Sequence, residues 1–251
     1  MKEKAEGKSA VPYLMYVLMA ITGILMTITG ILSGQSFFRI LPLYVSLVVG
    51  LLQSKVNRYA PLIGGINSLL YAAVYFYYGL LSSAVYAIVV SCPFQIITFL
   101  NWRKRAYGNS VVFKCMTKKQ RIVTACAVAA VWTVMYLILS AIGSNYILFD
   151  NTLTMFGILI TVLTMLAYIE YTWLMIPNCL CSVFLYIAMM LDKPEQIVYL
   201  IFSIYSLICN VKAFIAAGKL YAKQKQEQAQ AQMQAQEQAQ IQAAEGPRGE
   251  A

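Results

Sequence analysis

The sequence contains no histidine among its 251 residues, and only 12% of them are charged. The side chain that most often serves as a general base near neutral pH is therefore missing. No Walker sequence, HExxH zinc motif or Ser-His-Asp set is present, which excludes the usual machinery of nucleotide-driven pumps and hydrolases. The sequence predicts neither an enzyme nor a protein with a cofactor.

Cysteine is also scarce. The six cysteines fall almost entirely within apolar runs, where this residue behaves as a small hydrophobe. The spacing of Cys179 and Cys181 fits no metal motif, and without histidine or clustered thiols the sequence predicts no metal site and no disulfide.

Apolar residues take the place of the missing charge, since 60% of the chain is hydrophobic. Soluble domains usually have about 25% charged residues, so the expected solvent is lipid. A bilayer core needs roughly 20 apolar residues per helix. Eight stretches satisfy this: 13–32, 37–54, 60–79, 82–102, 121–143, 148–169, 171–191 and 196–217. The sequence predicts an all-α, polytopic membrane protein, with its first span retained as a helix because it lacks a cleavage pattern.

The net charge of +9 does not indicate a nucleic-acid partner, because the cations are confined to alternate connections between spans. They gather before the first span, between the second and third, between the fourth and fifth, and after the eighth. The intervening connections have almost none. Cationic connections face the cytoplasm, so we expect a plasma-membrane protein, embedded in the lipid bilayer, with both termini cytoplasmic.

An internal repeat is visible in the polar residues. The stretches INSLLYAAVY and PNCLCSVFLY each place a tyrosine eight residues after an asparagine, Asn67 to Tyr75 and Asn178 to Tyr186. A short connection and a helix that opens with Val-Tyr follow each stretch. Spans two to four and six to eight are therefore predicted to be two copies of one unit, and span five gives them the same orientation. Chance resemblance between apolar helices is the alternative.

The predicted organisation is a 3+1+3 parallel repeat with one additional amino-terminal transmembrane helix. The amino-terminal segment and first helix occupy residues 1–36, and the first three-helix bundle occupies 37–102. A basic loop and linker helix follow over 103–147, the second bundle over 148–217, and a Gln/Ala-rich tail over 218–251. The tail has no apolar stripe, so we expect at most marginal helicity there.

Three amides lie deep within the predicted spans: Asn67, Gln95 and Asn178. An unpaired amide in hydrocarbon costs several kcal/mol, so such groups face partners or a water-filled cavity. Neutral donors and acceptors of this kind suit a solute with hydroxyl or amide groups. A hydrogen bond between two helices, without any ligand, is the alternative for each.

Two acidic residues lie near helix ends. Asp150 stands at the start of span six, where it is either an N-cap that complements the positive helix end or a mouth residue that meets a cationic solute. Glu170 falls in a short turn and is expected to be a solvated charge.

Aromatic residues supply the remaining candidates. Trp102, beside Arg103, is expected in the interfacial belt. Trp173 precedes Asn178 by five residues and is either a belt residue or a stacking surface for a flat ring. We add Tyr75 and Tyr186 to the substrate-binding candidates because they mark the repeat.

Two segments resemble a known family. The run PFQIITFLNW, followed by a basic loop and TKKQR, is similar to the fourth-span signature of PnuC-type vitamin transporters. The segment from Asp150 to IEYTWLMIPN resembles their second signature, although the family usually has two tryptophans three residues apart before the Asn, where this chain has Tyr171, Trp173 and Met175. The resemblance covers about residues 37–217.

This resemblance implies a SWEET-like arrangement of two bundles around a linker helix. It further implies uptake of nicotinamide riboside by facilitated diffusion, with a cytoplasmic kinase trapping the solute. Relatives in the family carry thiamine, riboflavin or deoxynucleosides. By position, Gln95 and Asn178 become residues that hydrogen-bond the ligand, and Trp173 becomes a stacking residue.

We therefore expect an alternating-access carrier that holds ribose hydroxyls through Asn67, Gln95 and Asn178. A membrane receptor with the same cavity is a second hypothesis, with the tail as a partner-binding helix. A retinal protein linked through Lys212 is disfavoured, because this lysine falls near the inner surface, where it can snorkel. The oligomeric state, a homo-oligomer included, stays open.

Overall fold

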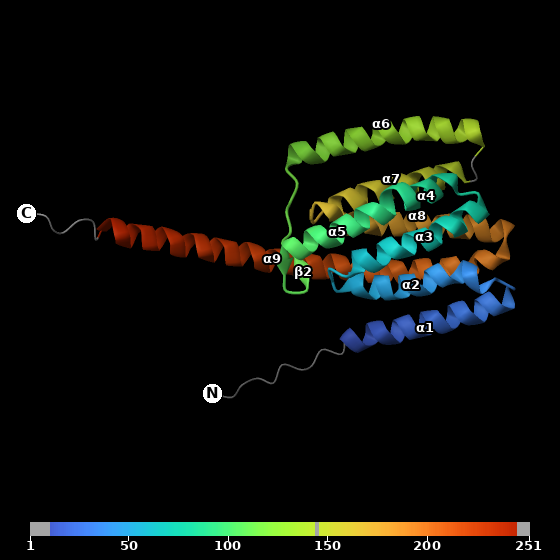
Figure 1. Ribbon diagram of the computed structural model, residues 1–251, viewed down its shortest axis with the longest axis horizontal. Coiled ribbons are helices and arrows are strands. Elements are labelled where there is room, and N and C mark those ends of the chain that lie inside the picture. Colours follow the sequence, from blue (N-terminus) through green and yellow to red (C-terminus); the bar gives the residue numbers. More distant parts are fainter. Residues whose placement is uncertain (1–10, 144–145, 245–251) are drawn as a thin grey trace, which may run out of the picture.

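The computed structural model describes residues 11–143 and 146–244 (Figure 1). The predicted cationic segment before residue 11 and the last seven residues lie outside these ranges. Within them, eight helical segments are long and apolar enough to cross a membrane, which confirms the predicted number and the helical, polytopic class. Each of them begins and ends within a few residues of its predicted stretch, apart from the last, which begins where predicted but extends much further.

Seven helices correspond to single elements: α1 (Val11–Leu32), α2 (Phe37–Ser54), α3 (Ala60–Tyr78), α6 (Lys118–Ile142), α7 (Ile147–Met165), α8 (Tyr171–Asp192) and α9 (Ile197–Ala244). The fourth span is built from α4 (Leu81–Tyr86), the π-helical turn η1 (Ala87–Ser91) and α5 (Cys92–Lys104). A short turn η2 (Pro194–Gln196) precedes α9. The basic connection adds a small hairpin, β1 (Ala106–Tyr107) and β2 (Ser110–Val111), that the all-α prediction did not include.

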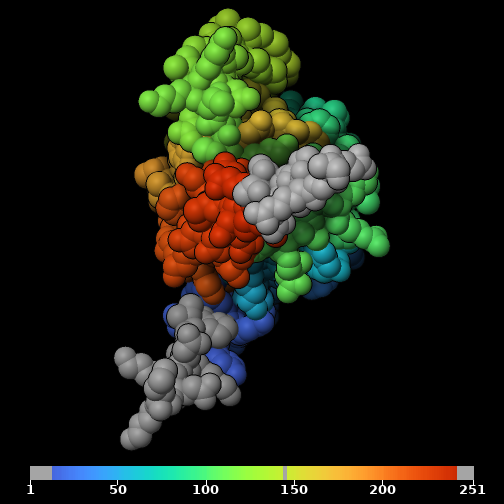
Figure 2. Space-filling view, turned by 90° about the vertical axis from the view of Figure 1, so that its left-hand side faces the viewer, coloured from blue at the N-terminus to red at the C-terminus, as the bar shows by residue number. Residues whose placement is uncertain are grey.

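Six spans form a closed ring. Its neighbours are α2 and α3, α3 and α5, α5 and α7, α7 and α8, α8 and α9, and finally α9 and α2. Helix α1 lies outside this ring against α2 and α9, and α6 packs mainly against α7. Figure 2, which looks onto the tail of α9, shows α6 protruding at the edge of the molecule. The ring encloses the site described below.

The π-helical turn in the fourth span has a local cause. Pro93 lacks an N–H, and its ring would collide with the carbonyl of the residue four positions earlier in a regular α-helix. The chain widens over Ala87–Ser91, and α5 then begins anew with Pro93 in its first turn, where no backbone donor is needed. Pro177, by contrast, lies within the unbroken α8.

Helix α9 continues past the membrane-spanning part without a break to Ala244, so the tail is helical over a longer stretch than expected (Figure 1). Its exit is fixed by side chains. Gln224 donates to the Val111 carbonyl over 2.9 Å and accepts from the Phe113 N–H over 3.0 Å. Tyr107 donates to Glu227 over 2.7 Å. The tail helix therefore starts from a base tied to the β1–β2 hairpin.

The connecting loop, defined here as residues 105–117, joins the fourth span to α6 and contacts both halves of the ring. The Arg58 N–H, in the α2–α3 turn, donates to the Asn109 carbonyl over 2.9 Å. Lys114 pairs with the α7–α8 turn, because its N–H donates to Ala167 and its carbonyl accepts from Ile169. The loop is thus held by backbone hydrogen bonds at one end of the ring, which we call the basic end.

Glu170 corrects a prediction. It is only 5% exposed, not solvated as expected. Its carboxylate accepts from the Met116 N–H over 2.8 Å and from the Arg121 guanidinium over 2.9 Å. Burial acts to raise the pKa of Glu170, but these hydrogen bonds, with those from its own backbone N–H and from Cys115, outweigh burial and hold the pKa below its usual value. The carboxylate therefore anchors the connecting loop and the start of α6.

A polar cavity between the two halves of the ring

The ring encloses a cavity of three adjoining lobes. The lobe towards the basic end has a volume of about 180 Å³, and the other two have about 150 and 220 Å³. Asn178 lines all three lobes, Tyr86 and Gly157 line the first two, and Tyr75 and Tyr186 line the second and third. The side chain of Asn178 therefore marks the point where the lobes meet.

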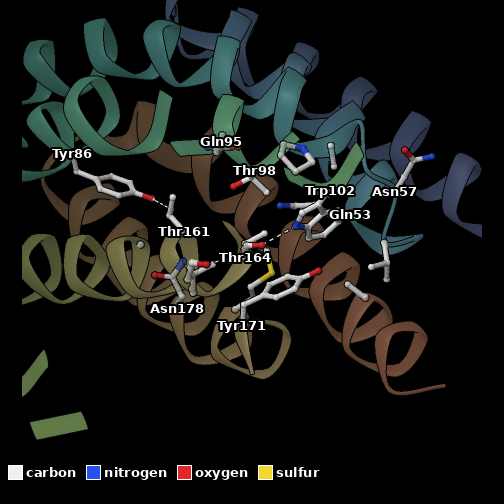
Figure 3. Close-up of a pocket in the computed structure, with 17 residues that line it drawn as sticks. Gln53, Asn57, Tyr86, Gln95, Thr98, Trp102, Thr161, Thr164, Tyr171 and Asn178 are labelled. Carbon is white, nitrogen blue, oxygen red and sulfur yellow. Dashed lines mark hydrogen bonds between the residues drawn. The ribbon is translucent and has the colours of Figure 1, made fainter. Parts of the chain in front are cut away.

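Gln95 forms part of one wall of the first lobe, on α5 (Figure 3). Its amide nitrogen donates to the Ser91 hydroxyl over 2.7 Å and to the Ser68 hydroxyl over 3.2 Å. A Cβ atom at Gly64 would overlap the Gln95 amide oxygen. Because glycine has no side chain, α3 leaves room for Gln95 at this position. The amide is therefore positioned by α3 and by the π-helical turn of its own span.

Asn178 lies on the facing wall, on α8 (Figure 3). Its amide oxygen is buried without a protein hydrogen-bond partner. Leaving such a group unsatisfied costs about 1–3 kcal/mol, and a bound solute or water that donates to it recovers this energy. This acceptor is therefore available to a ligand, at the junction of the lobes.

Tyr86 crosses between the halves of the ring. Its hydroxyl shares a 2.8 Å hydrogen bond with Thr161 of α7, which Figure 3 shows as a dashed line. A Cβ atom at Gly157 would lie 2.9 Å from the aromatic ring of Tyr86. Only glycine at this position therefore allows the Tyr86 side chain to pack against α7. The Tyr86 side chain lines both the first and the second lobe.

Trp102 and Tyr171 line the first lobe, and the sequence reasoning assigned them no role there. Trp102 is 2% exposed, and its indole N–H donates to the Thr164 carbonyl over 2.8 Å, so the predicted belt position is wrong. The ring centroids of Trp102 and Tyr171 are 6.3 Å apart. Gln95, Thr98 and Trp102 recur at helical spacing on one face of α5, and this spacing is the signal that could have identified the tryptophan.

Trp173 does not lie with the other predicted residues. Its side chain is 50% exposed, and it lines none of the three lobes. Helix geometry explains the difference, because Trp173 is five residues from Asn178 and points to another face of α8. The position agrees with the belt alternative and not with stacking on a ligand.

Asn67 is also placed outside the cavity. It is 3% exposed, and its amide donates to the Pro42 carbonyl over 2.9 Å and to the Ser46 hydroxyl over 2.8 Å. These bonds join α3 to α2, which is the ligand-free alternative stated for this residue. Of the three predicted amides, the structure therefore brings two to the cavity.

Asp150 lies at the start of α7 as predicted, but as neither an N-cap nor a mouth residue. The N-cap of α7 is Tyr146, four residues earlier, so Asp150 is not the cap, although its carboxylate does lie in the first turn, at the positive end of the helix. Asp150 is also 0% exposed, so it is not a mouth residue. Its carboxylate accepts a hydrogen bond from Ser83, which lines the second lobe. Asp150 thus lies directly behind the cavity wall.

No charged side chain is among the described residues that line the three lobes. The walls combine amides and hydroxyls with aromatic rings, which suits a small polar solute with a flat ring. A ring of helices long and apolar enough to cross a membrane, with such a cavity inside it, defines a multi-pass membrane protein with a site for a solute.

Comparisons with known proteins identify the kind of membrane protein. The profile of the nicotinamide mononucleotide transporter family matches residues 36–213, and the chain belongs to this family. The crystal structure of the vitamin B3 transporter PnuC shares its fold, with a TM-score of 0.73 and 20% sequence identity over 88% of this chain and 95% of that one. A comparison with curated protein sequences gave no match. The resemblance seen in the two sequence segments is confirmed.

Proposed function

We propose that this transporter carries nicotinamide riboside across the membrane by facilitated diffusion. The observation that supports it most directly is the unpartnered amide oxygen of Asn178, at the junction of a cavity whose described lining residues are uncharged. A ribose hydroxyl can donate to this oxygen. A mononucleotide would add a phosphate with charge of about −1.5 to −2, for which these residues supply no cation.

The proposed pose uses the two facing walls. Gln95 and Asn178 would hold the ribose hydroxyls, and the cationic nicotinamide ring would lie beside Trp102 and Tyr171 through stacking and cation–π attraction. The Tyr86 side chain, which lines both the first and the second lobe, would limit how far the nicotinamide ring extends from the first lobe towards the second. Trp173 has no part in this pose.

We further propose that the ring of helices is a SWEET-like 3+1+3 repeat. In support, α2, α3 and α5 correspond by order to α7, α8 and α9, and the contact of α2 with α9 has a counterpart in that of α5 with α7. Linker helix α6 lies outside the ring. Two such halves can rock about the cavity and open it alternately to each side.

The distribution of cations supports a cytoplasmic basic end and cytoplasmic termini. The imported riboside would then meet a cytoplasmic kinase, whose phosphorylated product cannot return through an uncharged cavity. Net uptake would follow from this trapping, without coupling to an ion gradient.

Flux into proteoliposomes tests the proposal. We expect saturable equilibration of labelled nicotinamide riboside, at least about tenfold faster than its mononucleotide, and no accumulation above the external concentration. Thiamine, riboflavin and deoxynucleosides are the competitors to compare. Binding without flux would indicate a receptor and contradict the carrier.

Variants of the two facing amides test the site. Asn178→Ala and Gln95→Ala should each lower kcat/KM by about tenfold, which corresponds to one hydrogen bond of about 1.4 kcal/mol. Trp173→Ala is the control, because its side chain lies outside the cavity, and it should transport like wild type. Wild-type rates in both amide variants would refute the proposed pose.

A further inference from the structure

Asp150 is a buried acidic residue that the proposed pose does not use. Among the residues that the structure describes, it is the only acidic side chain that is fully buried within a membrane-spanning helix. Glu170 lies in a turn, and Asp192 lies exposed at the end of α8. Placing a carboxylate within a membrane is energetically costly, so such residues usually serve a function.

One hydrogen bond separates this carboxylate from the cavity. Ser83 donates to an Asp150 carboxylate oxygen and itself lines the second lobe. Thr154, one helical turn after Asp150, lines the same lobe. The field of the carboxylate therefore reaches into the lobe, although its own atoms do not line it.

The surroundings strengthen that field. Interactions between charges are several-fold larger in a protein interior than in water, and the described lining residues carry no charge that would compete. Because the Ser83 hydroxyl donates its hydrogen bond to Asp150, the lone pairs of the Ser83 oxygen are left for the cavity. Both effects favour a positively charged solute and oppose an anion.

We propose that ionised Asp150, acting through Ser83 from the second lobe on the adjoining first lobe, is a positioning residue that makes the cavity selective for a cationic ring. The walls of the two lobes share three residues, Tyr86, Gly157 and Asn178. A ring beside Trp102 and Tyr171 therefore lies in the neighbouring part of the same cavity. The inference rests on the proposed function and deepens it, since it predicts discrimination between two ribosides that differ only in charge. Nicotinamide riboside carries a positive pyridinium ring. Its reduced form, dihydronicotinamide riboside, has almost the same shape and a neutral ring.

The experiment measures uptake of both ribosides into proteoliposomes by wild type, Asp150→Asn and Ser83→Ala. Wild type should prefer the cationic riboside by about tenfold or more in kcat/KM. Asp150→Asn keeps the shape and a hydrogen-bond acceptor but removes the charge. It should therefore lower transport of the cationic riboside to about the rate of the neutral one, and leave transport of the neutral riboside within about twofold of wild type.

Ser83→Ala keeps the charge and should reduce the preference for the cationic riboside by about threefold. Asp192→Asn, which removes an exposed carboxylate, is the matched control and should keep the wild-type preference.

Equal loss of both substrates in a folded Asp150→Asn protein would overturn the proposal and indicate a purely structural carboxylate. An unchanged preference would overturn it as well, and so would a wild type that carries both ribosides equally. If Asp150→Asn does not fold, the Ser83→Ala ratio decides, and an unchanged ratio there refutes the proposal. Failure of the proposed function looks different, because wild type would then transport neither riboside.

Discussion

Asn67 and Asn178 occupy matching positions in the proposed repeat, yet their amides have different partners. The sequence could predict that each amide lies deep in a span and faces away from lipid, because an amide exposed to hydrocarbon is energetically costly. It could not predict the neighbours. Ser46 and the Pro42 carbonyl, on a helix more than twenty residues away in the chain, accept from the Asn67 amide nitrogen. Neither amide oxygen has a protein partner, but only Asn178 lines the cavity, where a solute can donate to it.

This difference predicts opposite effects of the same substitution. Asn67→Ala should lower the free energy of unfolding by about 1–3 kcal/mol, because it leaves buried groups on α2 unpaired, and should leave the substrate KM unchanged. Asn178→Ala should raise KM and leave the melting temperature equal or higher. Thermal melts combined with flux measurements separate the two cases, and a raised KM in Asn67→Ala would show that this residue does meet the solute.

Gly64 makes a second prediction at the residue scale. In Gly64→Ala the new methyl group would displace the Gln95 amide, so transport should fall and stability should drop by about 1–3 kcal/mol from overpacking. Gly218→Ala is the matched control, because a Cβ atom there meets nothing within 4 Å, and alanine favours a helix by up to about 1 kcal/mol. Unimpaired transport by Gly64→Ala would mean that Gln95 needs no fixed position.

At the scale of elements, hydrophobic length predicted the spans well but not what lies within or between them. The π-helical turn Ala87–Ser91 depends on how the chain relieves Pro93, and Leu81–Lys104 has the same hydropathy with or without it. The sequence likewise identifies the connecting loop only as a cationic stretch. Its hydrogen bonds to Glu170 and Gln224 join residues more than fifty positions apart, which no local pattern encodes.

The anchoring of the connecting loop by Glu170 predicts a pH dependence. Because its pKa is lower in the folded protein than in the unfolded chain, this carboxylate adds stability above its unfolded pKa of about 4.3, and the contribution is lost as the pH falls through the folded pKa. Apparent melting temperatures should therefore fall below about pH 4.5. Glu170→Gln should be less stable at pH 7 and lose this part of the acid sensitivity. The same acid slope in the variant as in wild type would contradict the role.

At the scale of the whole molecule, the closed ring implies that transport requires its two halves to move relative to each other. The sequence predicted the halves from the Asn and Tyr repeat, but not their closure, because the contacts of α2 with α9 and of α5 with α7 join distant segments. We call these two contacts between the halves, α2 with α9 and the fourth span with α7, the seams of the ring. If the halves rock, both seams must change during each transport cycle.

A disulfide across one seam tests this movement. The Ser82 hydroxyl donates to Thr154 over 2.8 Å, between α4 and α7, so cysteines at both positions can be oxidised to a cross-link. Transport by Ser82→Cys/Thr154→Cys should be lost on oxidation and return with a reductant, whereas each single variant should respond to neither. Full flux through the cross-linked protein would exclude rocking at this seam.

The unbroken α9 has a practical consequence. Its 48 residues extend over about 72 Å, of which a bilayer covers only about 30 Å. Since Gln224 and Glu227 brace the point where this helix leaves the body, a marker domain spliced onto it in helical phase would inherit a fixed orientation. Such a fiducial would give electron cryomicroscopy an alignment handle on a protein with little mass outside the lipid.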